Sequence, residues 1–137
     1  MFTVFEKPNV LLRLEGGAVF VLALAVYWHQ SFGWPLFWST ILLPDLALFG
    51  YLVNARLGAS AYNITHSKLL PTLLGLFAIT SNNALCMALT LIWFVHIGMD
   101  RLLGYGLKYT DGFKFTHLGT IGGSKEQPHG RFLPCGK

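Results

Sequence analysis

The sequence predicts an all-α integral membrane protein, a bundle of four transmembrane helices with both termini in the cytoplasm. Of the 137 residues, 53% are hydrophobic and 12% are charged, whereas soluble domains carry about 25% charged residues. The apolar residues gather in four segments that approach the about 20 residues needed to cross a bilayer. The Lys and Arg residues lie outside or at the ends of these segments, as membrane topology requires.

The first predicted span covers residues 10–27, with Glu15 near its start. The second covers 34–53. Pro44 lies in the middle of the second segment, where proline predicts a kink because it has no N–H group to donate. Asp45 follows directly, so this kink carries a carboxylate.

The third predicted span covers 64–79, which is short and contains Pro71. The fourth, 84–99, is the most uniformly apolar, and its polar residues are confined to its ends. His96 lies close to the end at which the chain leaves the membrane. We expect residues 1–122 to form one membrane domain.

Residues 101–122 are rich in Gly, Lys and aromatic side chains. Disordered segments are poor in aromatic residues, so we expect this segment to fold back as a cap over the cytoplasmic end of the bundle. Residues 123–137 form a polar tail that we expect to be flexible.

The ten Lys and Arg residues are distributed on one side of this arrangement. They precede or open the first span, lie between the second and third, or follow the fourth. The positive-inside rule places that side in the cytoplasm, and we expect a multi-pass protein of the bacterial inner membrane. The basic residues form no stripe interleaved with aromatics, so no nucleic-acid partner is predicted.

Ionisable side chains recur at a similar predicted depth in the cytoplasmic half of all four spans. Such groups are rare in membrane segments and usually functional. His96 and Asp100 are four residues apart and share one helix face. Two imidazoles with carboxylates suit a divalent metal such as Zn, Fe or Mn. The predicted metal ligands are Glu15, Asp45, His66, His96 and Asp100.

A structural interpretation of the same residues stays open. Glu15 can simply pair with Arg13 or Arg101, and Asp45 can cap the backbone groups that Pro44 leaves free. The two histidines can be ordinary polar residues at a helix interface. The spacing of a histidine and an aspartate four residues apart also arises by chance on many helices.

Further polar residues at the same end complete the candidate site. We expect Asp45, Asp100 and Arg101 to be catalytic, with Arg101 also suited to an anionic head group. The predicted substrate-binding residues are Tyr51, Asn63, Tyr105 and Lys108.

Four blocks of the sequence stand out, at residues 12–16, 44–51, 58–66 and 96–119. They resemble a bacterial membrane family known as domain of unknown function 4260. The resemblance covers residues 11–122 and is most specific over 96–109. It implies a membrane protein but no activity or ligand. The family's characteristic polar residues fall on Glu15, Asp45, Asn63, His66, His96, Asp100 and Arg101.

The leading functional hypothesis is a metal-dependent enzyme that acts on a lipid or another hydrophobic substrate at the cytoplasmic leaflet. A hydrolytic reaction with metal-activated water and a redox reaction at a di-iron or haem centre both stay open. The alternative is a non-catalytic accessory subunit of a larger membrane complex, or a homo-oligomer. A third hypothesis is a proton or ion carrier that uses the buried carboxylates.

Overall fold

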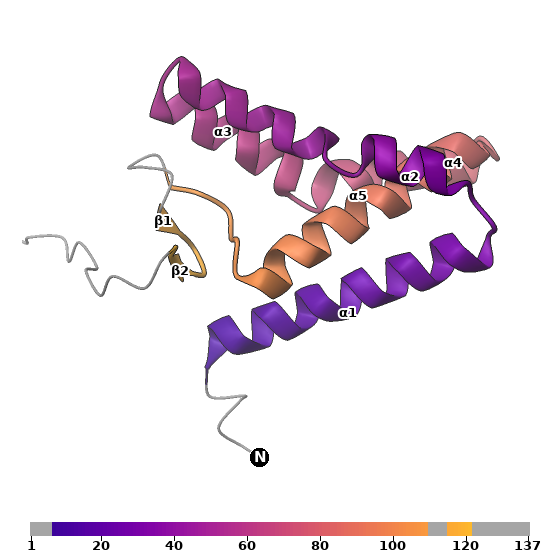
Figure 1. The fold of residues 1–137 in the computed structure, drawn as a ribbon, viewed down its shortest axis with the longest axis horizontal. Coiled ribbons are helices and arrows are strands. Elements are labelled where there is room, and N and C mark those ends of the chain that lie inside the picture. Colours follow the sequence, from indigo (N-terminus) through magenta and orange to yellow (C-terminus); the bar gives the residue numbers. More distant parts are fainter. Residues whose placement is uncertain (1–6, 110–114, 122–137) are drawn as a thin grey trace, which may run out of the picture.

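The computed structural model describes residues 7–109 and 115–121 (Figure 1). Almost all of this part of the chain is helical. The helices are α1 (Pro8–His29), α2 (Trp34–Thr40), the 3-10 helix η2 (Leu43–Leu52), α3 (Ala55–His66), α4 (Leu69–Thr80) and α5 (Ala84–Leu103). A small antiparallel hairpin follows, made of β1 (Phe115–Thr116) and β2 (Gly119–Thr120). The described part of the predicted cap thus ends in this hairpin, and the predicted tail at 123–137 lies outside the described residues.

Three helical stretches of the described chain are long and apolar enough to cross a membrane: Pro8–His29, Trp34–Leu52 and Ala84–Leu103. Three of the four predicted spans are therefore confirmed as helical stretches that are long and apolar enough to cross a membrane. The prediction of one continuous third helix over 64–79 is wrong. That region instead contains the end of α3 and most of α4, two helices of 12 residues each.

Proline explains why both inner passes are interrupted. Pro71 has no N–H to donate to the Ser67 carbonyl four residues earlier, and its ring would clash with that carbonyl in a continuous helix. Ser67 accordingly adopts an extended backbone, with φ −77° and ψ 149°, between α3 and α4. Pro44 likewise cannot bond to Thr40, the last residue of α2.

The chain passes between the two ends of the molecule four times (Figure 1). The passes are α1, then α2 with η2, then α3 with α4, and finally α5. Helix α3 packs against η2, whereas α1 and α4 pack against α5. The start of α1 and the end of α5 therefore lie at the same end of the molecule (Figure 1).

The core lies toward the opposite end and is wholly apolar apart from one phenol. Tyr27, Phe37, Ile92 and Val95 are among its buried members. The Tyr27 hydroxyl donates a hydrogen bond of 2.7 Å to the Gly33 carbonyl oxygen. This aromatic cluster joins the turn after α1 to α5 and leaves the polar residues to the other end.

Candidate metal centre

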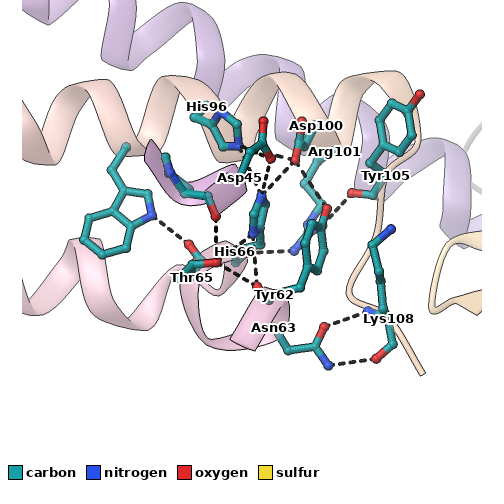
Figure 2. A network of polar contacts seen from close by, with 12 residues as sticks. Asp45, Tyr62, Asn63, Thr65, His66, His96, Asp100, Arg101, Tyr105 and Lys108 are labelled. Atoms are coloured by element: carbon teal, nitrogen blue, oxygen red, sulfur yellow. Dashed lines mark hydrogen bonds and ion pairs between the residues drawn. The ribbon is translucent and has the colours of Figure 1, made fainter. Parts of the chain in front are cut away.

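Four of the predicted ligands converge between the two interrupted passes and α5. Asp45 comes from the first turn of η2, His66 from the last residue of α3, and His96 and Asp100 from one face of α5. One ligand atom from each lies within 4.8 Å of every other (Figure 2). This arrangement is a possible metal-binding group.

The distances between these atoms are closely matched. His66 Nε2 lies 3.1 Å from His96 Nε2, 3.3 Å from Asp45 Oδ1 and 3.3 Å from Asp100 Oδ2. His96 Nε2 lies 3.4 Å from Asp45 Oδ1 and 3.6 Å from Asp100 Oδ2. Five of the six edges of a tetrahedron are therefore between 3.1 and 3.6 Å long.

The hydrogen bonds of His66 determine which of its ring nitrogens faces the cluster as a ligand. Nδ1 lies 3.0 Å from the Tyr62 carbonyl oxygen, which can only accept a hydrogen bond. Nδ1 also lies 2.9 Å from Thr65 Oγ1, and the tautomer with the proton on Nδ1 can donate to the Tyr62 carbonyl oxygen while the neutral ring presents the lone pair of Nε2 to the cluster. A backbone carbonyl that orients a histidine in this way is typical of metal sites.

The four ligands differ in their exposure. The side chains of His66 and His96 are 0% and 1% exposed, that of Asp100 is 14% exposed, and that of Asp45 is 37% exposed. Among the described residues, His96 Nδ1 is buried without a hydrogen-bond partner. The cluster is thus open to the outside mainly on the Asp45 side.

Side chains satisfy the carbonyl groups that the two helix breaks leave free. Thr65 Oγ1 lies 3.2 Å from the Pro44 carbonyl oxygen and 3.1 Å from that of Tyr62, within hydrogen-bond distance of both. Trp93 Nε1 donates to the Thr65 carbonyl oxygen at 2.7 Å. Arg101 Nη2 donates to the His66 carbonyl oxygen at 2.9 Å. In a membrane each unsatisfied backbone group is costly, so these contacts allow both helices to end at the cluster.

Glu15 does not join the other predicted ligands, because the adjacent Gly16 sets the rotation of α1. Gly16 is buried against α5, where an added Cβ would overlap the Arg101 side chain. Successive helical residues are rotated by about 100°, and Glu15 is accordingly exposed. Its predicted place as a metal ligand is wrong in this structure.

Arg101 lies beside the cluster, but its hydrogen bonds go to backbone. Its Nη1 donates to the Tyr105 carbonyl oxygen at 2.6 Å, and its Nη2 donates to His66 as described above. Arg101 is 7% exposed. This geometry suits a residue that positions His66 and the chain after α5, rather than the catalytic and head-group roles predicted for it. His66 itself ends α3, whereas the predicted third span, 64–79, placed it near the start of a helix.

Three of the predicted substrate-binding residues, Asn63, Tyr51 and Lys108, contact other parts of the protein, whereas Tyr105 is more exposed. The Asn63 side chain forms two hydrogen bonds of 2.7 Å with the backbone of Lys108. The Tyr51 ring lies directly against Gly58. Tyr105 is 39% exposed. The Lys108 ammonium lies 4.6 Å from the centroid of the Tyr62 ring, so residues after α5 dock on α3.

Tyr62, Thr65 and Trp93 are site residues that the sequence analysis missed. The Tyr62 ring stacks on the His66 ring with centroids 3.7 Å apart, and its hydroxyl donates to Asp100 Oδ2 at 3.4 Å (Figure 2). Tyr62 precedes His66 by four residues, so helical spacing was a usable signal. The Trp93–Thr65 contact joins distant segments and left no such signal.

Comparison with known proteins gives a family but no function. No curated protein matches the chain. No solved structure matches it either. One family model covers nearly all of the described residues, in agreement with the resemblance noted from the sequence. Because the model matches residues 9–121, the chain belongs to the family described as domain of unknown function (DUF4260).

Proposed function

We propose that this protein binds one divalent metal ion within the membrane through Asp45, His66, His96 and Asp100. We further propose that the metal acts on a lipid or another hydrophobic substrate at the cytoplasmic leaflet of the bacterial inner membrane. The apolar helices and the one-sided distribution of Lys and Arg support this location.

The observation that carries the proposal is the near-tetrahedral arrangement of the four ligand atoms. Zinc binds histidine nitrogen and carboxylate oxygen at about 2.0–2.2 Å in tetrahedral geometry, which requires ligand atoms roughly 3.3–3.6 Å apart. Four of the five edges, at 3.3–3.6 Å, match that requirement, and the edge between His66 and His96 is slightly shorter at 3.1 Å. An octahedral ion at about 2.1 Å would bring neighbouring ligands to roughly 3.0 Å. Zinc therefore fits better than iron or manganese.

Charge supports the same conclusion. Two neutral imidazoles and two carboxylates carry a net charge of −2, and their ligand atoms lie within 4.8 Å of one another. Like charges at this distance oppose each other in a poorly solvated site. A divalent cation neutralises them, whereas the guanidinium of Arg101 is directed at carbonyl groups.

If the site is catalytic, Asp45 is the ligand that a water molecule can replace most easily. It is the most exposed of the four, and catalytic zinc sites use three protein ligands with a fourth, open position. A metal at His66, His96 and Asp100 would lower the pKa of a water bound there, and Asp45 could accept its proton. Because two histidines and one carboxylate with an open position also suit non-haem iron, the preference for hydrolysis depends on the metal being zinc.

A second candidate function follows from the same four ligands. When all four bind, the tetrahedron is closed, and closed sites are typical of structural zinc. The protein would then be a metal-stabilised accessory subunit of a larger membrane complex, with no reaction of its own.

Elemental analysis of detergent-purified protein tests the metal site. We expect one zinc per chain in the wild type and in His29→Ala, which alters an exposed histidine at the end of α1. The double variant His66→Ala with His96→Ala should contain less than a tenth as much. Equal metal in all three proteins, or none in a folded wild type, would refute the site.

Cobalt substitution separates the two candidate functions. Tetrahedral Co²⁺ absorbs strongly in the visible range, and azide changes this spectrum only where it can reach the metal. A spectral change in the wild type supports an open, catalytic position. An unchanged spectrum would support the structural site, and Asp45→Ala should then create the azide response.

A further inference from the structure

A separate apolar cavity lies next to the metal centre, at the level of the two helix breaks. Its volume is about 290 Å³. Thr40 and Pro44 line it from the break between α2 and η2, Thr65 from the end of α3, and Leu74 from α4. Leu89 and Trp93 line it from α5. Pro44, which interrupts the pass made by α2 and η2, is therefore part of the cavity wall.

The polar side-chain groups that line this cavity already donate within the protein. Thr40 Oγ1 donates to the Leu36 carbonyl oxygen at 2.7 Å. Thr65 Oγ1 lies within hydrogen-bond distance of carbonyl oxygens, and Trp93 Nε1 donates to the Thr65 carbonyl oxygen, as described above. Water needs two to four polar partners in a cavity. The surface that remains is hydrocarbon, so the cavity suits an apolar occupant.

The position of the cavity relates it to the metal centre. Pro44 and Thr65 directly precede the ligands Asp45 and His66 in the chain. Along α5, Leu89 and Trp93 come seven and three residues before His96, or about 10 and 5 Å at 1.5 Å per residue. A molecule lying along α5 can thus place its apolar part in the cavity and its polar part at the metal.

We propose that this cavity binds one acyl chain of a membrane lipid whose polar group faces the metal. A volume of about 290 Å³ lies just below the roughly 300–1,000 Å³ of ligand pockets, so the cavity accommodates part of one chain and not two chains. The assignment of the polar end rests on the proposed metal site. The assignment of the chain rests on the cavity itself.

Photolabelling tests the cavity. Palmitic acid with a diazirine near its methyl end is the probe, used with wild-type protein in detergent at low probe occupancy. We expect labelling within residues 84–100 that excess unlabelled palmitic acid reduces at least tenfold. Labelling that excess palmitic acid does not reduce would show only lipid around the helices and would overturn the proposal.

A matched pair of variants localises the label. Leu74→Trp fills the cavity and should reduce specific labelling at least tenfold, whereas Leu73→Trp alters a neighbour that is 53% exposed and should leave it unchanged. If Leu74→Trp does not fold, Leu89→Phe replaces it, with Leu85→Phe, at a site 56% exposed, as its control. Equal labelling of a folded cavity variant and its control would contradict the proposal.

Metal content measured on the same samples separates the two proposals. Specific labelling without metal would retain the acyl-chain site and reject the metal centre. Bound metal without specific labelling would retain the metal centre and reject the acyl-chain site. Where both are present, palmitohydroxamic acid should compete at about one tenth of the concentration of palmitic acid, and chelation should remove this advantage. Equal competition by palmitohydroxamic acid and palmitic acid while metal is bound would show that the polar group of the lipid does not face the metal.

Discussion

The two faces of α5 hold the protein together in different ways. Toward α1, Gly98 lies so close to its partner that an added Cβ would be 2.6 Å from the Phe20 amide nitrogen and 2.8 Å from the Gly16 carbonyl oxygen. Toward η2 and α3, the same helix presents His96 and Asp100. One face is held by close packing of small residues, as is common between membrane helices. The other face carries the ionisable groups.

This difference shows which changes each face tolerates. The face toward α1 depends on close contact between small residues. Added side-chain volume should therefore destabilise it, whereas metal binding should not affect its packing. The opposite face depends on the chemistry of its side chains, so it is sensitive to the loss of a donor or acceptor. Substitutions on α5 should therefore separate stability from metal binding, depending on the face that they change.

The largest expected effect is on metal affinity, from His96→Leu. Removal of partners outside the ligand set typically weakens metal binding 10–100-fold, so loss of a ligand should weaken it by at least about 100-fold. The metal-free protein should be no less stable, because among described residues His96 Nδ1 is buried without a partner. Metal titration and thermal unfolding in chelator measure the two effects. A large loss of metal-free stability would show that His96 serves packing, and His29→Leu is the control.

Gly98→Ala, on the face of α5 toward α1, should have the opposite effect: lower stability with unchanged metal affinity. The added methyl group must push α1 away, and overpacking typically costs about 1–3 kcal/mol. Unfolding of the metal-free protein should show this loss, while the folded fraction binds metal with unchanged affinity. Gly33→Ala is the control, since its Cβ would meet only Pro35 Cδ at 3.8 Å. Equal stability of the two variants would show that α1 and α5 are free to separate.

Arg101→Met should have a smaller effect on metal affinity. It tests Arg101, which contacts both α1 and the ligand His66. The methionine keeps the stem beside Gly16 but leaves the His66 carbonyl oxygen without its donor. We expect about tenfold weaker metal binding, as for other residues that orient ligands. Arg13→Met removes an exposed guanidinium that donates to Leu102 at 3.0 Å, and it should leave metal affinity unchanged. A loss shared by both variants would indicate a general charge effect.

Asn63→Leu tests the attachment of the chain after α5. It removes both hydrogen bonds to the Lys108 backbone, each with a net contribution of about 1 kcal/mol. Hydrogen exchange at the Lys108 amide should accelerate at least tenfold, with little change in α1. The control is Ile64→Leu at the neighbouring position, which is 57% exposed. Unchanged exchange would mean that this segment is held in place by other contacts.

The last prediction concerns pH. Burial lowers the pKa of the Lys108 ammonium to about 8, whereas an unfolded lysine titrates near 10.4. Between these values the unfolded chain binds more protons than the folded one, so the free energy of unfolding rises with pH. We expect the melting temperature to rise from pH 8 to 10 relative to Lys108→Met. A constant difference between the two proteins across this range would contradict the prediction.

Much of this arrangement could be predicted from the sequence. The density of apolar residues indicates membrane helices, and the positions of charged groups along each span indicate depth. Asp45, His66, His96 and Asp100 were chosen on depth and on the helical spacing of the last two, and they converge in the structure. Depth is a local property, because it depends on how far a residue lies from the end of its own apolar segment.

Only the tertiary structure decided the rotation of each helix and the partner of each polar group. Glu15 shares the predicted depth but faces outward, because Gly16 must meet α5. Arg101 donates to the Tyr105 carbonyl oxygen and to the His66 carbonyl oxygen, and the latter is free only because α3 ends at His66. Helical periodicity determines which residues of one helix share a face. The direction of that face depends on close packing with segments far away in the chain, and no single segment of the sequence contains that information.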